Sequence, residues 1–182
     1  FNMPSDHAEV SLTNVTVPGS TMLGEEGRGL DVAQTFVEEN RIRQAASSLG
    51  AAQYCINESV AYAKVRKPFG KPLASNEGIQ FPLAQHWAEV ECARLMNYKA
   101  ATLFDTGKPY GTEANVAKLL ASQAASAGIE QAMQTMGGMG YAREYHVERY
   151  WREARLMKIA PVSQEMVCNY IASNVLGLPK SY

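Results

Sequence analysis

The chain has 182 residues, of which 46% are hydrophobic and 19% charged, and its formal net charge is −1. This composition suits one globular domain with an appended segment, gives no indication of nucleic-acid binding, and contains no apolar run long enough to cross a bilayer. Three cysteines and three histidines are scattered without the spacing of a metal site. We therefore expect a soluble protein without a metal and with free thiols in a reducing compartment, either the cytoplasm or, in a eukaryote, an organelle matrix.

The chain begins with strand-like sequence. Residues 7–17 place apolar side chains at alternating positions, and Pro18 and Gly19 end the pattern. One or two strands do not form a stable sheet alone, so this segment is expected to complete a sheet that lies mostly outside the chain. The absence of an initiator methionine suggests a piece of a longer polypeptide. Glycine-rich residues 24–29 are the predicted linker, and residues 1–28 the first unit.

Residues 29–182 are predicted to fold as a mainly α, antiparallel helical bundle. Apolar residues recur at steps of three and four over 42–63, 79–103 and 112–136, which is the period of one helix face. Proline and glycine separate these segments, and Thr112 is the predicted N-cap of the third. Three long helices joined by short loops indicate a bundle.

Two shorter helices are predicted to follow. Residues 145–158 are highly charged, and Glu148 and Arg152 lie four apart, where they can pair on one helix face. Ser163 is a predicted N-cap of the last helix, and Glu165 falls in its first turn, where the helix dipole favours a negative charge.

Between these two groups of helices lies the glycine-rich turn of residues 134–141, QTMGGMGY. A helical pattern precedes it, so it does not match the dinucleotide-binding fingerprint, which follows a strand. Gly137 as a left-handed C-cap residue would explain one glycine of three. The alternative is that Gly137, Gly138 and Gly140 let another chain or a ligand approach bare backbone.

Four segments in this order resemble the C-terminal helical domain of acyl-CoA dehydrogenases: YAKVRKPFGKPL at 62–73, IQFPLA at 79–84, QTMGGMGY at 134–141, and ERYWREAR at 148–155. The resemblance covers nearly the whole chain, and residues before Gly29 resemble the tail of that family's middle β-domain. It implies non-covalent FAD, a homo-oligomer built as a dimer of dimers, and a flavin-type electron acceptor. It also implies oxidation of an acyl-CoA thioester to the 2,3-enoyl-CoA, by loss of an α-proton and a β-hydride.

The resemblance assigns cofactor contacts to five residues of the bundle. Arg66 and Phe69 resemble the residues that meet the flavin diphosphate and adenosine. Gln134, Gly137 and Gly138 resemble the segment that receives the adenosine portion, typically from a neighbouring subunit. A guanidinium supplies a fixed charge and bidentate geometry for phosphate. From the residues alone, Arg66 is equally explained as a charge favoured at a helix C-terminus.

The remaining contacts implied by the resemblance lie elsewhere in the chain. Arg41 matches a position near the CoA moiety, although a solvated helix-surface arginine is the simpler interpretation. Ser163 and Glu165 match the turn where a helix N-terminus faces the cofactor. Glu77 stands where the family commonly has glutamine, and a carboxylate there would repel the diphosphate unless it points elsewhere.

The usual catalytic base of the family is missing. Pro161 stands where the family has glutamate, and Asn40 occupies the position that supplies the base in a minority of members; neither can serve as a strong base. Glu38, Glu39 and Glu165 are the nearest carboxylates. We predict Glu39 as the base, although it lies about 100° from the alternative position on a helix of 3.6 residues per turn.

Three functions remain open from the sequence. The first is the C-terminal part of an FAD-dependent acyl-CoA dehydrogenase, expected to be inactive as a fragment. The second is a flavin oxidase or monooxygenase on the same scaffold, in which the conventional base is dispensable. The third is a noncatalytic oligomerisation domain.

Overall fold

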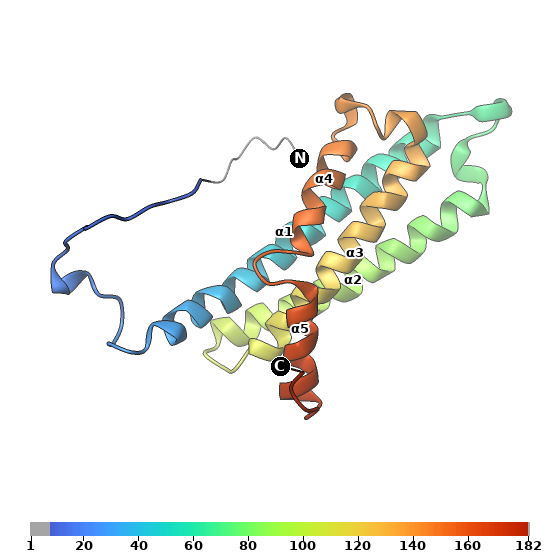
Figure 1. Cartoon of the computed structure of the whole chain (residues 1–182). Helices are drawn as coiled ribbons and strands as arrows, with labels where there is room; N and C mark the ends of the chain where they lie inside the picture. The colour runs from blue at the N-terminus through green and yellow to red at the C-terminus, as the bar shows by residue number, and fades with distance from the viewer. Residues whose placement is uncertain (1–7, 182) are drawn as a thin grey trace.

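The structure, a computed structural model, describes residues 8–181 and is almost entirely helical beyond residue 28 (Figure 1). Its helices are α1 (Gly29–Val65), α2 (Glu77–Asp105), α3 (Gly111–Met136), α4 (Val147–Met157) and α5 (Gln164–Tyr170), which continues as a π-helical turn, Ile171–Val175. The predicted mainly α bundle is confirmed. No helix of the described chain is both long and apolar enough to span a membrane.

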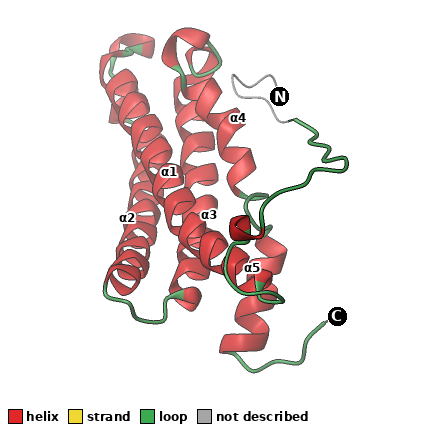
Figure 2. Ribbon diagram, turned by 90° about the vertical axis from the view of Figure 1, so that its left-hand side faces the viewer, coloured by secondary structure: helices red, strands yellow, loops and turns green. Residues whose placement is uncertain are grey.

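The predicted strand at 7–17 is not formed. Residue 7 lies outside the described residues, and residues 8–18 form an exposed segment without a strand that trails away from the helices (Figures 1 and 2). Val10 and Leu12 are 78% and 81% exposed. A strand needs a neighbouring strand to pair its backbone groups, and residues 8–181 contain none. The expectation that the sheet lies outside the chain stays a prediction.

The three long helices lie side by side, with α2 running opposite to α1 and α3 (Figures 1 and 2). Helix α1 ends just before Pro68 and Gly70, as predicted, because proline lacks the amide that the next turn needs. The N-cap of α3 lies two residues earlier than predicted, at Tyr110 rather than Thr112, and it makes no side-chain cap hydrogen bond.

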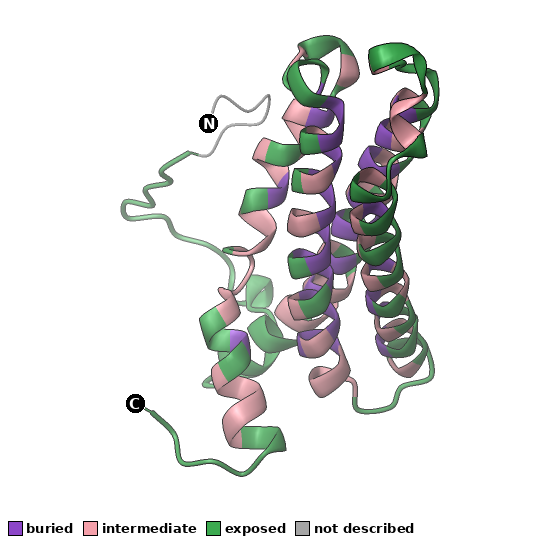
Figure 3. Cartoon of the chain, turned by 90° about the vertical axis from the view of Figure 1, so that its right-hand side faces the viewer, coloured by how far each residue is buried: buried purple, intermediate pink, exposed green. Residues whose placement is uncertain are grey.

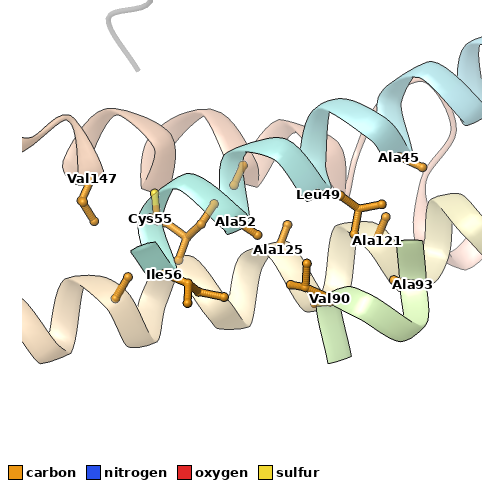
Figure 4. Packing of buried hydrophobic residues seen from close by; sticks show 14 of the residues in the cluster. Ala45, Leu49, Ala52, Cys55, Ile56, Val90, Ala93, Ala121, Ala125 and Val147 are labelled. Carbon is orange, nitrogen blue, oxygen red and sulfur yellow. The ribbon is translucent and has the colours of Figure 1, made fainter. Parts of the chain in front are cut away.

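Helix α3 is the centre of the bundle and packs against α1, α2 and α4. Its buried face consists mainly of alanine, serine and glycine, which lets the neighbouring helices approach closely. A Cβ atom at Gly128, for example, would stand 3.3 Å from Ile56 Cδ1 of α1. Figure 3 shows the buried residues lining the inner faces of the helices. The core shown in Figure 4 includes Ala45, Leu49, Ala52, Cys55, Ile56, Val90, Ala93, Ala121, Ala125 and Val147.

Helix α4 contacts α1 through an aromatic pair. The rings of Tyr54 and Tyr150 are 5.1 Å apart between centroids. On the outer side of α4, Glu148 and Arg152 form the predicted pair, with 2.7 Å between Oε2 and Nε. This pairing, together with the hydrogen bond from Arg152, lowers the pKa of Glu148.

Candidate cofactor and active site

The loop after α1 presents Arg66 to solvent on a fixed backbone. Its amide donates to the carbonyl of Tyr62 at 2.9 Å, and its carbonyl accepts from the amide of Leu73 at 2.7 Å. The residue is exposed. The loop is therefore held at both sides of Arg66, which leaves a positive charge positioned by the backbone and open to an external anion.

Phe69, three residues further on, is strained and fully exposed. Its φ of 56° lies in the left-handed region, which is unfavourable for a bulky residue, and its side chain is 106% exposed. Such backbone strain costs about 1–3 kcal/mol and persists at sites where surrounding structure imposes it. The ring gains nothing from packing within residues 8–181, so it is available for an external partner.

The three glycines after α3 have different physical roles. Gly137 ends the helix with φ 58° and ψ −134°, so it is the C-cap residue but is not left-handed helical. Gly140 packs on the preceding turn, where a Cβ would stand 2.7 Å from the carbonyl oxygen of Met133. Gly138 has neither a positive φ nor any atom within 4 Å of its Cβ position. Nothing in the described chain requires glycine at 138.

The two loops lie at the same end of the bundle (Figures 1 and 2). The rings of Tyr62, near the end of α1, and Tyr145, in the loop after the glycine turn, meet edge to face at 6.1 Å. The fold thus gathers exposed cofactor candidates from both loops at one end, which we call the glycine-turn end: Arg66, Phe69, Gln134, Gly137 and Gly138. Glu77 begins α2 at this end and is also exposed, at a helix N-terminus that favours its charge.

Arg41 lies at the other end of the bundle and, contrary to the solvated interpretation, is only 8% exposed. Burial lowers its pKa, an effect that the nearby charge of Glu38 opposes. Its Nε atom has no hydrogen-bond partner among the described residues. A buried donor without an acceptor costs about 1–3 kcal/mol, more for a charged group, so this position suits a ligand oxygen.

Arg41 lines a cavity of about 740 Å³ between the first half of α1 and the α5 region. Glu38 lines the same cavity from α1, and Val162 and Tyr170 line it from the opposite side. A cavity of this size is within the range that binds small molecules and cofactors. It combines a carboxylate and a buried guanidinium in one space.

The predicted start of α5 is confirmed. The Oγ atom of Ser163 accepts a hydrogen bond from the amide of Met166 at 3.3 Å. The Glu165 carboxylate accepts from its own backbone amide and from the Ser163 side chain, and both hydrogen bonds lower its pKa. Neither Ser163 nor Glu165 lines the 740 Å³ cavity. The capping explains both residues locally, and their predicted cofactor contact stays a prediction.

Lys118 was missed by the sequence reasoning. It is 1% exposed, and its Nζ donates to the carbonyl oxygen of Val162, the residue after Pro161. Burial lowers the pKa of Lys118, as does the charge of Arg41, whereas Glu165 raises it. The signal was present in the sequence, because Lys118 lies four residues after Ala114 and three before Ala121 on the apolar face.

The adjacent glutamates Glu38 and Glu39 lie in different surroundings. Glu39 Oε1 is 3.5 Å from Arg43 Nε, its side chain is 42% exposed, and it does not line the cavity. Glu38 does line it. The structure thus brings Arg41 and Glu38 together with the turn that carries Pro161 and does not bring Glu39 there. The role of Glu39 as a base stays a prediction.

Comparison with protein families gives one match. Residues 27–176 match the family model described as acyl-CoA dehydrogenase, C-terminal domain. Among curated relatives, acyl-CoA dehydrogenase FadE12 of Mycobacterium tuberculosis is 42% identical over 183 residues, covering 98% of this chain and 47% of the relative. The short-chain specific acyl-CoA dehydrogenase of Bos taurus mitochondria is 40% identical over 178 residues, covering 98% of this chain and 42% of the relative.

Solved structures agree with this match. Butyryl-CoA dehydrogenase from Megasphaera elsdenii superposes with a TM-score of 0.86 at 38% identity, covering 88% of this chain and 42% of that one. A glutaryl-CoA dehydrogenase in complex with glutaryl-CoA gives a TM-score of 0.87 at 34% identity, covering 93% and 43%. The chain therefore spans less than half the length of these relatives.

Proposed function

The chain belongs to the acyl-CoA dehydrogenase family through its C-terminal domain, and from this premise we propose that it is the helical part of an FAD-dependent enzyme. The proposed reaction is oxidation of an acyl-CoA thioester to the 2,3-enoyl-CoA. Bound FAD would supply the acceptor for the hydride that leaves the substrate's β-carbon. The portion of the relatives outside this chain would complete the site, so the fragment alone is expected to be inactive.

One observation carries the cofactor proposal: the glycine-turn end exposes binding groups that the described chain itself does not use. Arg66 offers a guanidinium for a phosphate, and Phe69 offers an unpacked ring for a nucleoside. Gly138 offers a backbone surface that no other part of the described chain approaches. These groups fit FAD, because a flavin adenine dinucleotide combines an anionic diphosphate with planar rings.

We propose that this end is completed by a second copy of the chain. Gln134, Gly137 and Gly138 would receive the adenosine portion of FAD held by Arg66 and Phe69 of a neighbouring subunit. The expected assembly is a homo-oligomer arranged as a dimer of dimers. A flavin-type protein is the proposed electron acceptor.

At the other end, the cavity lined by Arg41 is the proposed binding site for part of the acyl-CoA substrate. The unpaired Nε of Arg41 is a donor for an oxygen of that ligand. Ser163 and Glu165, at the start of α5, remain proposed cofactor neighbours.

The resemblance to the family favours a second candidate function. It implies a glutamate base where this chain has Pro161 or, in a minority of members, where it has Asn40. A flavin oxidase or monooxygenase on this scaffold would not need that base. A noncatalytic oligomerisation domain is the third candidate.

Flavin spectroscopy of the full-length protein separates these functions. A dehydrogenase contains bound FAD and is bleached anaerobically by an acyl-CoA. Bound flavin that no thioester bleaches, together with oxygen consumption, would favour the second candidate. A colourless full-length protein that takes up no FAD would favour the third.

The cofactor site is tested by Arg66→Ala in the full-length protein, with Lys67→Ala as the matched control. Loss of a charge-assisted hydrogen bond of about 1.5–3 kcal/mol should weaken FAD binding roughly 10- to 150-fold. Lys67 is an exposed neighbour without an assigned contact, and its replacement should leave binding nearly unchanged. Equal FAD affinity of both variants, measured by fluorescence titration, would remove Arg66 from the site.

A further inference from the structure

The cavity beside Arg41 contains one carboxylate that can act where the usual base is absent. Glu38 lines one wall, and Val162, the residue directly after Pro161, lines another. The cavity that adjoins the turn where the family resemblance implies a glutamate therefore has a glutamate on its α1 side. Pro161 and Asn40 cannot accept a proton at neutral pH.

Helix geometry separates Glu38 from its neighbour Glu39. Consecutive residues project about 100° apart on an α-helix, so the two side chains leave α1 in different directions. Glu39 lies 3.5 Å from Arg43 and outside the cavity. Glu38 forms no such ion pair within residues 8–181, although its negative charge raises the pKa of Arg41 and so opposes the effect of burial. Glu38 is thus the acidic side chain of α1 that faces the cavity.

A glycine at the start of α3 makes room for this carboxylate. A Cβ atom at Gly111 would stand 2.9 Å from Glu38 Oε1 and 3.3 Å from the hydroxyl oxygen of Tyr170. Gly111 has no positive φ, so the turn itself does not require glycine. Its missing side chain instead leaves space for Glu38.

A second observation indicates that a ligand belongs in this cavity. The Nε atom of Arg41 is buried and has no acceptor among the described residues. The residue as a whole is only 8% exposed. Buried donors are normally paired. A polar ligand with an oxygen acceptor would satisfy Arg41 and at the same time lie beside Glu38.

We propose that Glu38 is the catalytic base that removes the α-proton of the acyl-CoA thioester. The Cα–H bond breaks, the proton forms an O–H bond with the Glu38 carboxylate, and the electron pair stays on the thioester as its enolate. This inference rests on the proposed dehydrogenase function and assigns the base to Glu38 in place of Glu39.

The test measures exchange of the substrate's α-hydrogens with solvent deuterium, followed by NMR in the full-length FAD-bound protein. Glu38→Gln should slow exchange at least about 100-fold, because general-base catalysis contributes roughly 10²- to 10⁴-fold. The matched control Glu26→Gln removes an exposed carboxylate outside the cavity and should exchange within about twofold of the wild type. Glu39→Gln is measured beside it as the competing assignment of the base. FAD content and melting temperature of each variant are measured in parallel.

Gly111→Ala provides an independent variant that does not remove the carboxylate. Alanine is favoured over glycine in a helix by about 1 kcal/mol, so the fold should be retained. Its Cβ would displace the flexible end of Glu38, and a misplacement of about 1 Å can cost roughly 100-fold in rate. Slower exchange with an unchanged or raised melting temperature would support the assignment.

The outcomes distinguish the base from the proposed function. If the wild type exchanges α-hydrogens and Glu38→Gln does so equally fast, Glu38 is not the base and the dehydrogenase proposal stands. If Glu39→Gln alone is slow, the role belongs to Glu39. If the wild type neither exchanges α-hydrogens nor is bleached by any acyl-CoA, the proposed function fails and the assignment of Glu38 fails with it.

Discussion

At the scale of single residues, two cations are buried close enough to influence each other. Arg41 is 8% exposed and Lys118 1% exposed, and each has a lowered pKa because burial disfavours its charged form. The Lys118 ammonium is partly compensated by the carbonyl of Val162, to which it donates. Lys118 thus ties α3 to the turn that follows Pro161. The cost of its buried charge should depend on pH.

Lys118→Met tests this cost. The pKa of Lys118 is lower in the folded chain than its ordinary value of 10.5, so between these two values the unfolded chain binds more protons. Stability from this group therefore rises with pH in that window, and methionine removes the rise. We expect the unfolding free energy of the wild type, relative to Lys118→Met, to increase as the pH rises from the lowered pKa of Lys118 toward 10.5, measured by urea titrations at a series of pH values.

The exposed Lys67 provides the control for this measurement. Lys67→Met changes the same side-chain charge at a solvent-facing position. The difference between wild type and Lys67→Met should vary less with pH than the Lys118 difference. A Lys118 difference that stays constant or shrinks with rising pH would contradict a buried, charged Lys118.

At the scale of elements, α3 positions both candidate sites because it runs through the centre of the bundle. Its C-terminal end carries the glycine turn, and its N-terminal half carries Lys118 and Gly111 beside the cavity. Small buried residues along its length hold α1 at a close distance. The spacing between these helices is therefore set by residues that have almost no side chain.

Ala125→Leu tests this close packing. Ala125 is fully buried in the α1–α3 core (Figure 4). Inserting a larger side chain into a packed core forces shifts that typically cost about 1–3 kcal/mol. Ala46 of α1 is exposed, so Ala46→Leu should change the unfolding free energy by less than about 0.5 kcal/mol. Equal urea midpoints for the two variants would show that the interface is looser than described.

At the scale of the whole molecule, the glycine-turn end of the bundle exposes groups that no other part of the described chain covers. Phe69 is fully exposed in a strained conformation, and nothing in the described chain requires glycine at position 138. Large exposed apolar groups and open backbone are typical of surfaces that another molecule covers. We have proposed a neighbouring subunit and FAD as that cover.

Gly138→Leu tests this cover. A Cβ atom at 138 would have no neighbour within 4 Å and the position is exposed, so the melting temperature of the chain should hardly change. In the full-length protein the same side chain should reduce FAD retention and the fraction of tetramer, measured by flavin absorbance and sedimentation. Unchanged assembly and FAD content would show that nothing approaches Gly138.

Gly140→Ala is the matched contrast. Its Cβ would stand 2.7 Å from the carbonyl oxygen of Met133, which is backbone and cannot move cheaply. This variant should lower the melting temperature even in the chain alone. Comparing the variants at Gly138 and Gly140 thus separates a glycine needed for assembly from a glycine needed for the fold.

The sequence alone determined the helices, their order and the family. Helical periodicity depends on local spacing, and ordered motifs such as QTMGGMGY are visible without coordinates. The cap at Ser163 was also predictable, because capping involves residues within one turn. The strand was not correctly predicted, since strand pairing is not local and residues 8–181 contain no strand with which residues 8–17 could pair.

Only the tertiary structure decided which polar side chains are buried together. Lys118 was not predicted to be buried, and its contact with Val162 spans 44 positions of the chain. Likewise, Glu38 and Glu39 are indistinguishable as residue types, and only the way α1 lies relative to α3 and the α5 region turns one toward the cavity. Burial and long-range contact depend on how helices pack, and neither is encoded in the spacing of a single segment.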